Sequence, residues 1–307
     1  MILSCGEALI DMLPRDSTAG EPSFAPYAGG AVFNTAIALG RLGAPSSFLS
    51  GLSTDLFGDV LRATLVASGV DTSHAILSNR PTTLAFVKLT NGQASYAFYD
   101  ENTAGRLISP ADLPDLPASI TTMFFGGISL MVEPGGATYE ALMAREAPRR
   151  VTMIDPNIRP TFITDTATYR ARIARMIAMA DVVKLSDEDL HWLEGTGDIT
   201  ALARGILVRG PKAVFITEGA AGARGITASD EVFVAAQKVT VADTVGAGDT
   251  FNAGVLASLH QAGVLTKAAL ANLTPDTIRD ALTLGNRAAA ITVSRPGANP
   301  PWRRELA

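Results

Sequence analysis

Short, continuously apolar segments alternate with amphipathic segments along most of the chain, and this alternation restricts its fold more than any other feature. Strands that are apolar on both faces lie inside a sheet that is covered by helices on both sides. The pattern therefore predicts an α/β fold with a mostly parallel sheet. The expected strands are Ile2–Cys5, Ser47–Gly51, Met123–Phe125, Val151–Asp155, Asp181–Leu185 and Ala213–Thr217.

Helical periodicity falls between these strands, with apolar residues recurring every three or four positions. The chain has 307 residues, of which 47% are hydrophobic, and this is enough for one sizeable core. We expect residues 1–307 to form a single domain. The expected helices are Ala31–Leu42, Phe57–Ala67, Thr138–Glu146, Tyr169–Ala178, Asp187–Glu194, Ile199–Arg209, Thr250–Ala262 and Pro275–Val293.

Two stretches interrupt the alternation and have an extended, turn-rich character. These are Glu21–Tyr27 and Ala75–Tyr99. Within the second, strand-like segments flank Asn91-Gly92, a dipeptide typical of tight hairpin turns. We expect a small β subdomain, formed by roughly residues 12–28 and 75–106 and inserted within the domain. Such a subdomain could close over a site as a lid.

Composition excludes several classes of protein. The net charge is -5 and the chain has no basic run, which argues against nucleic acid as a partner. The single cysteine, Cys5, cannot form an intrachain disulfide. The N-terminus lacks the basic residues of a signal peptide, and no apolar run is long enough to span a bilayer. We expect a cytoplasmic protein without a membrane partner.

The segment Asp243–Gly254, DTVGAGDTFNAG, gives the strongest chemical signal. Its glycines allow a tight turn, and the helix that follows offers unpaired N–H groups and a positive dipole end. This arrangement suits the terminal phosphates of a nucleotide. A carboxylate at this point repels phosphate, so Asp249 needs another role. It is either a simple helix cap or the base that takes a proton from an attacking hydroxyl group, and the complete segment favours the base.

Together with Gly29–Gly43 (GGAVFNTAIALGRLG), this segment resembles the paired signatures of the ribokinase-like (PfkB) carbohydrate kinases. The resemblance extends from GEALIDM near the start to SRPGANP near the end. It implies a three-layer α/β/α fold with a β lid, and transfer of a phosphoryl group from ATP, with Mg²⁺, to a primary hydroxyl group of a sugar. It also implies that Asp249 is the base and that the amides of Gly246, Ala247 and Gly248 bind the developing charge.

Residues of the first signature and of the lid are expected to bind the sugar. Gly29 and Gly30 let the backbone approach a small ligand, and Asn34 offers donors and acceptors for hydroxyl groups. Asp11 follows the first strand, at the sheet edge where open α/β folds bind ligands. The alternatives are a capped turn for Asp11 and a local backbone bond for Asn34.

Further sugar and phosphate contacts follow from the resemblance. Arg106 would return from the lid toward the sugar, and Phe98 would pack on the sugar face. Arg159, in the segment DPNIR, would lie near the transferred phosphoryl group, where its fork of donors is suitable. A surface salt bridge is the alternative for Arg159.

The nucleotide and the cations are also assigned by resemblance. Residues expected near ATP are Lys184, Thr217, Gly219, Gly222, Gly246, Gly248 and Asn286. Asp189 occupies the position of an acid that acts on Mg²⁺ through water, although Ser186 and Asp189 also form a capping box. The residues Asp243, Val245, Val293 and Gly297 resemble a monovalent-cation site, which would take K⁺.

Three other functions fit the sequence less well. A P-loop kinase needs a Gly-Lys dipeptide, which the sequence lacks. GEALIDM, TAGR and DPNIRP resemble bacterial fructokinases, so phosphorylation of D-fructose to fructose 6-phosphate is favoured over that of 2-keto-3-deoxygluconate. A catalytically inactive sugar-binding protein on the same fold is the non-enzyme alternative. A homodimer that pairs through the lid is expected, because exposed lid strands need protection.

Overall fold

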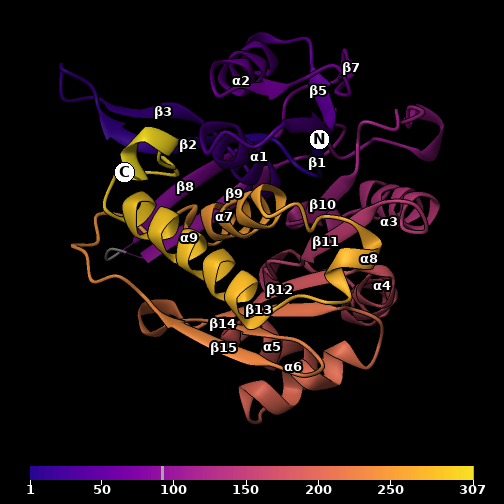
Figure 1. Ribbon diagram of the computed structural model, residues 1–307. Helices are drawn as coiled ribbons and strands as arrows, with labels where there is room; N and C mark the ends of the chain where they lie inside the picture. The colour runs from indigo at the N-terminus through magenta and orange to yellow at the C-terminus, as the bar shows by residue number, and fades with distance from the viewer. Residues whose placement is uncertain (91–92, 307) are drawn as a thin grey trace.

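A nine-stranded sheet runs through the middle of the protein in the order β15-β14-β13-β12-β11-β10-β1-β4-β6 (Figure 1). The computed structural model describes residues 1–90 and 93–306. The parallel strands are β1 (Ile2–Cys5), β4 (Ser46–Leu49), β6 (Val70–Asp71), β10 (Thr122–Gly126), β11 (Val151–Asp155), β12 (Val182–Ser186) and β13 (Ala213–Thr217). At one edge, β14 (Gly222–Ile226) and β15 (Glu231–Ala235) continue the sheet antiparallel. The predicted mostly parallel sheet is therefore confirmed, and its antiparallel edge was not anticipated.

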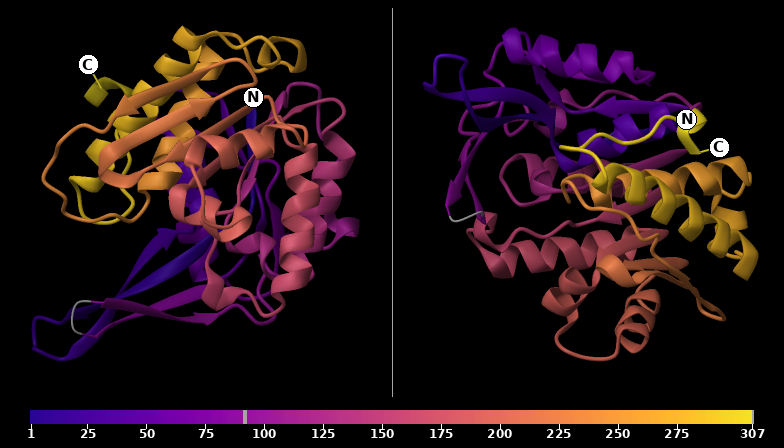
Figure 2. Two further views of the ribbon diagram at one scale, coloured as in Figure 1. Left: turned by 90° about the horizontal axis from the view of Figure 1, so that it is seen from below. Right: turned by 90° about the vertical axis from the view of Figure 1, so that its left-hand side faces the viewer.

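Helices cover both faces of this sheet and make the fold three-layered (Figures 1 and 2). The helices of one face are α1 (Ala31–Arg41), α2 (Leu56–Ala67), α7 (Ala247–Gln261), α8 (Lys267–Leu270) and α9 (Pro275–Val293). Those of the other face are α3 (Gly135–Glu146), α4 (Thr166–Met179), α5 (Asp187–Glu194) and α6 (Ile199–Leu207). None of the described helices is long and apolar enough to cross a membrane.

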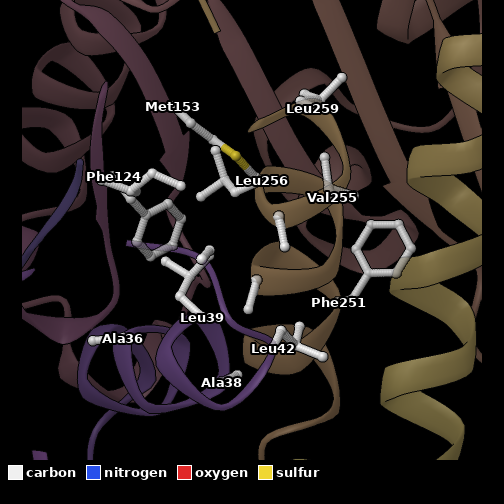
Figure 3. Close-up of a cluster of buried hydrophobic side chains, with 14 of the residues drawn as sticks. Ala36, Ala38, Leu39, Leu42, Phe124, Met153, Phe251, Val255, Leu256 and Leu259 are labelled. Carbon is white, nitrogen blue, oxygen red and sulfur yellow. The ribbon is translucent and has the colours of Figure 1, made fainter. Parts of the chain in front are cut away.

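The core is divided in two by the sheet, because successive side chains of a strand point to opposite faces. On β10, Phe124 packs into the cluster beneath α1 and α7, whereas Met123 and Phe125 pack into the cluster on the other face. Figure 3 shows the first cluster, in which Leu39 of α1 and Leu256 of α7 meet over the sheet. This packing fixes the position of α1 relative to α7.

A second, four-stranded sheet projects from the main body (Figure 2). Its strands are β2 (Leu9–Asp16), β3 (Pro22–Gly29), β8 (Leu84–Thr90) and β9 (Gln93–Tyr99), in the order β3-β2-β8-β9. The predicted turn at Asn91-Gly92 lies outside the described residues. A small two-stranded sheet, β5 (Gly51–Ser53) with β7 (Ile76–Ser78), was not predicted. We call the four-stranded sheet the lid sheet.

Two expected boundaries near the site differ from the structure. The lid was expected to start at about residue 12, but β2 starts at Leu9, so that Asp11 is its third residue and pairs with Tyr27 of β3. The helix predicted to start at Thr250 starts at Ala247, because Gly246 takes the left-handed conformation (φ 78°) that serves as its N-cap. Asp249 therefore lies inside the first helical turn.

The crossing of α7 and α9 depends on a close approach of two glycines. A Cβ atom on Gly254 would lie 2.6 Å from the Cα atom of Gly285. Alanine at position 254 would have to push the helices apart, and overpacking of this kind costs about 1–3 kcal/mol.

We therefore expect Gly254→Ala to lower the midpoint of thermal unfolding. Gly205→Ala is the matched control, because a Cβ on this exposed glycine of α6 would meet nothing within 4 Å. In a helix interior that exchange stabilises by up to about 1 kcal/mol. Calorimetry of both variants checks the prediction, and a shift of both midpoints in the same direction would contradict it.

Candidate active site

A cleft of about 1020 Å³ lies between the carboxyl ends of the parallel strands and the lid sheet. One wall is the turn that enters α7, and another is the lid residue Asp11. The sequence-predicted residues that line it are Asp11, Gly30, Asn34, Phe98, Arg106, Arg159, Val245, Gly246, Ala247, Gly248 and Asp249. The structure thus brings together residues that are more than 200 positions apart, such as Asn34 and Asp249.

Asp249 is buried at the entrance of α7, where it faces α1. Its Oδ2 accepts a hydrogen bond from Asn34 Nδ2 at 2.9 Å, and its backbone oxygen accepts one from Thr35 Oγ1 at 3.2 Å. Burial raises the pKa of Asp249 to about 7, partly opposed by the Asn34 hydrogen bond. A carboxyl group with this pKa can accept and release a proton near neutral pH.

A buried network lies behind Asp249. Lys184 Nζ binds Asp155 Oδ2 at 3.0 Å, and Asn252 Nδ2 donates to the same oxygen at 2.7 Å. Lys184 does not line the cleft, but its Nζ lies 3.2 Å from where a Cβ on Gly248 would be. The ammonium group is therefore directly beneath the glycine turn, and the absence of a side chain at Gly248 makes room for it.

The lid side of the cleft is built around Asp11. A Cβ atom on Gly29, in the paired strand β3, would overlap Asp11 Oδ2, so that only glycine leaves room for this carboxylate. Burial raises the pKa of Asp11 to about 6. Above that pH the carboxylate is ionised and acts only as an acceptor, which suits hydroxyl donors.

Arg106 lies where the lid returns to the main body. Its Nη1 binds Asp100 Oδ1 at 2.9 Å, and its Nε donates to the Glu133 carbonyl at 3.2 Å. Phe98 also lines the cleft, with its ring at 4.0 Å from that of Phe162, centroid to centroid, in an edge-on arrangement. These contacts connect the end of the lid sheet to both sides of the cleft.

Arg159 reaches the cleft from the segment after β11. Its Nη1 donates to the Ile158 carbonyl at 3.0 Å, and no acidic partner within 4.0 Å is found for it in residues 1–90 and 93–306. The surface salt bridge considered for Arg159 is therefore absent from the described structure.

Several residues expected near the nucleotide lie outside the cleft. Asn286 Nδ2 donates to the Val234 carbonyl at 2.8 Å, so this amide group supports β15. A Cβ on Gly222 would also overlap the Val234 carbonyl. Thr217 ends β13, and Gly219 follows it with a φ of 53° in open space. All four therefore surround the antiparallel edge of the sheet.

The residues expected near a monovalent cation connect two loops. Asp243 Oδ1 accepts from Val245 N at 3.0 Å, and Oδ2 accepts from Gly297 N at 2.9 Å. The Val293 carbonyl accepts N–H groups from Ala242 and Asp243. In this conformation Val293 therefore binds the loop instead of offering a free oxygen.

Asp189 is buried in the first turn of α5, where only half of the expected capping box is present: its N–H donates to Ser186 Oγ at 3.0 Å, but no bond from the Ser186 N–H to its side chain is found among the described residues. Asp189 Oδ1 accepts from Ile158 N at 3.2 Å. Burial and the charge of Asp155 raise the pKa of Asp189 to about 6. Within the described part of the chain, no three His, Cys, Asp or Glu side chains are grouped so as to hold a metal ion.

Sequence reasoning missed three acidic residues of the cleft: Glu7, Asp100 and Glu133. Glu7 lies buried at the start of α1, and Asp100 binds Arg106. Of these, only Glu7 belongs to a segment quoted above for its resemblance, GEALIDM. Neither spacing nor residue type alone distinguished them from ordinary loop acids.

The buried carboxyl group of Asp249 generates a prediction about stability. Its pKa is about 7 in the folded protein against 3.8 for an ordinary Asp. Protonation of Asp249 therefore stabilises the folded state fully below about pH 4, and this stabilisation is lost as the pH rises through 7. Asn resembles the protonated form at every pH.

We therefore expect Asp249→Asn to raise the unfolding midpoint at pH 8 by more than it does at pH 5. Thermal unfolding of both proteins at the two pH values measures this difference. An effect of equal size at both pH values would show that the wild-type carboxyl group carries no raised pKa.

Comparison with known proteins identifies the family. Residues 1–304 match the pfkB family of carbohydrate kinases. The chain is 58% identical over 280 residues to a fructokinase of Rhizobium leguminosarum bv. trifolii, covering 91% of this chain and 86% of that protein.

Solved structures agree. The structure of a Xylella fastidiosa fructokinase with bound ATP matches with a TM-score of 0.90 at 29% identity, covering 99% of this chain and 97% of that one. A Vibrio cholerae fructokinase double mutant, solved with fructose, ADP and potassium ion, matches with a TM-score of 0.83 at 26% identity, covering 97% of this chain and 93% of that one. The predicted three-layer, ribokinase-like fold is confirmed, and the chain belongs to the pfkB family of carbohydrate kinases.

Proposed function

We propose that this protein is a fructokinase, which transfers the γ-phosphoryl group of ATP to the 6-hydroxyl group of D-fructose. The observation that carries the proposal is the place of Asp249: a buried carboxyl group with a pKa of about 7, at a helix N-terminus that opens into a large cleft. The identity of the sugar is supported by the Rhizobium leguminosarum relative, which is a fructokinase.

The sugar lies between the lid sheet and α1 in this proposal. The Asp11 carboxylate accepts hydrogen bonds from sugar hydroxyl groups, and Gly29 and Gly30 let the backbone come close. Asn34 already donates to Asp249, so its main role is to orient the base. Phe98 covers the sugar, and closure of the lid excludes water from the reaction.

Asp249 takes the proton of the 6-hydroxyl group while that oxygen attacks the γ-phosphorus in line. The amides of Gly246, Ala247 and Gly248 begin α7, and their N–H groups with the helix dipole stabilise the charge that develops on the phosphoryl oxygens. Arg159, which lines the same cleft, adds the positive charge of its guanidinium group, and Lys184 adds positive charge beneath the glycine turn.

Acidic residues of suitable chemistry are present for both proposed cations, Mg²⁺ and K⁺. Asp189 is a buried acid beside Asp155, and it would hold Mg²⁺ through water. Mg²⁺ neutralises phosphate charge in such reactions. Asp243 accepts only backbone N–H groups among the bonds of the described residues. With the loop carbonyls of Val245 and Gly297, it would hold K⁺ and so steady the turn that leads into Gly246.

The charge around Arg106 favours a neutral sugar over 2-keto-3-deoxygluconate. An acid sugar needs a cation for its carboxylate, and Arg106 is the arginine that lines the lid side of the cleft. Its charge is already balanced by Asp100 at 2.9 Å. The guanidinium group therefore has donors for hydroxyl groups but little net charge to offer a carboxylate.

A homodimer through the lid is part of the proposal. The face of the lid sheet turned away from the cleft exposes Phe24 and Tyr99, at 47% and 64%. Both rings contact Phe86 edge-on, at 5.0 and 5.5 Å between centroids. An exposed aromatic cluster on a sheet with two free edges gains stability when a second copy covers it.

We expect fructose to be the preferred acceptor when ADP release is measured with MgATP and fructose, 2-keto-3-deoxygluconate, ribose, glucose or adenosine. Asp11→Asn should lower kcat/KM for fructose by about 10- to 100-fold, because a hydrogen bond to a charged group contributes about 1.5–3 kcal/mol. Asp16→Asn, an exposed change at the far end of the same strand, is the control. A preference for 2-keto-3-deoxygluconate would overturn the substrate, and turnover of none would favour a non-catalytic sugar-binding protein.

We expect Asp249→Asn to lower kcat by about 10²–10⁴, the usual contribution of a general base, with fructose binding largely retained. In the wild type, kcat/KM should fall as the pH drops below about 7, because the base becomes protonated. Steady-state kinetics from pH 5 to pH 9 and calorimetric fructose binding measure both effects. A variant with near-normal kcat would remove Asp249 from the mechanism.

A further inference from the structure

Glu7 is a buried acid with an unusual set of partners. It follows β1, it is 8% exposed, and it lines the cleft. Its Oε1 accepts from the N–H of Ala31, the first residue of α1, at 2.9 Å. Its Oε2 accepts from the N–H of Ser129, in the segment after β10, at 3.2 Å. One side chain therefore connects two walls of the cleft.

The surrounding backbone is shaped to admit this carboxylate. Gly127 has a φ of 68°, and a Cβ atom there would overlap Glu7 Oε1. Gly30 has a φ of 110°, and a Cβ atom there would lie 3.0 Å from the Glu7 carbonyl. In the described part of the chain, no cation lies within 4.0 Å of Glu7. Burying a charge in this way is costly, and burial accordingly raises the pKa of Glu7 despite its backbone hydrogen bonds.

The first turn of α1 connects Glu7 to Asp249. Asn34 stands one turn after Ala31, on the same side of the helix, and donates to Asp249 Oδ2. Thr35 donates to the backbone oxygen of Asp249. Any shift of the helix start would therefore move both groups that hold the base.

We infer that Glu7 is a positioning residue: it fixes the start of α1 against residues 127–129 and thereby, through Asn34, the carboxylate of Asp249. The inference rests on the proposed role of Asp249 as the base. Burial is the main cause of the raised pKa of Asp249, and four groups from separate elements modify it: Asn34 on α1, Asp155 on β11, Lys184 on β12 and Glu7 after β1. Glu7 thus also adds a negative charge that helps to keep the proton of Asp249 bound.

A simple helix cap predicts something different. Loss of a cap lowers stability by about 0.5–2 kcal/mol but leaves the chemical step alone. A positioning residue changes kcat, because small displacements of a reacting group cost up to about 100-fold in rate. Asp198, which caps α6 by accepting from Ala201 N at 2.9 Å, provides the matched cap.

The test compares Glu7→Gln, Glu7→Asp and Asp198→Ala with the wild type, using the sugar that the wild type phosphorylates best. Glu7→Gln should lower kcat at least about 10-fold with little change in KM for the sugar. The increase of kcat/KM with pH, which reports the deprotonation of Asp249, should also shift to lower pH, because Glu7→Gln removes a negative charge near Asp249. Glu7→Asp keeps the charge but shortens the side chain, so kcat should fall while the rise stays in place. Asp198→Ala, which removes a cap far from the site, should lower only the unfolding midpoint.

Carboxyl NMR of Asp249 in the wild type and in Glu7→Gln gives a second readout that needs no turnover. If no sugar is phosphorylated, the proposed function fails, yet a lower pKa of Asp249 in Glu7→Gln would still support the structural link. If Glu7→Gln does not fold, Glu7→Asp decides: a reduced kcat supports the inference, and an unchanged kcat overturns it. Wild-type kcat and an unmoved Asp249 titration in a folded Glu7→Gln would reduce Glu7 to a cap.

Discussion

The hydrogen bond between Asn34 and Asp249 is the contact on which the rest of the site depends. It joins α1 to α7, and both helices lie on the same face of the main sheet above a shared apolar cluster. Asp249, the proposed base, is therefore held by packed helices and not by a loop, which makes its position insensitive to lid movement. The apolar surroundings that fix the helices also remove water from the carboxyl group, and this burial raises its pKa toward neutrality.

The charges of Lys184 and Asp155, behind the site, do not cancel the rise in the pKa of Asp249. Lys184 lies close enough to Asp249 to lower its pKa, but it is bound to Asp155, whose own charge acts in the opposite direction. The ion pair leaves a positive group beneath the glycine turn, where phosphate is proposed to bind, without fully ionising the base. A lone lysine at this point would favour the permanently charged carboxylate, and a lone aspartate would favour the protonated acid. In the proposed mechanism, the pair would allow one site both to bind an anion and to accept a proton.

The parts of the fold that the sequence predicted are those with strong local patterns. The apolar strands and amphipathic helices were found with small boundary errors, and DTVGAGDTFNAG indicated Asp249 because a carboxylate at an anion site needs an explanation. The start of α7 was wrong by three residues, since the left-handed conformation of Gly246 can begin a helix earlier than apolar periodicity shows. Glu7 was missed for a different reason. Its partners, Ala31 and Ser129, are 24 and 122 positions away and bind it through backbone N–H groups, which the sequence does not reveal.

In the lid sheet, strand β9 contributes side chains to two different surfaces. Alternate residues of β9 face opposite sides, so Phe98 lines the cleft while Tyr99 joins the exposed aromatic cluster. Asp100, directly after this strand, binds Arg106, and Arg106 in turn binds the Glu133 carbonyl of the main body. A partner that covered the aromatic face would therefore act on the same strand that positions Phe98 and Arg106. The proposed association through the lid and the proposed sugar binding in the cleft would then be coupled by the pleat of one strand, without any further element to connect them.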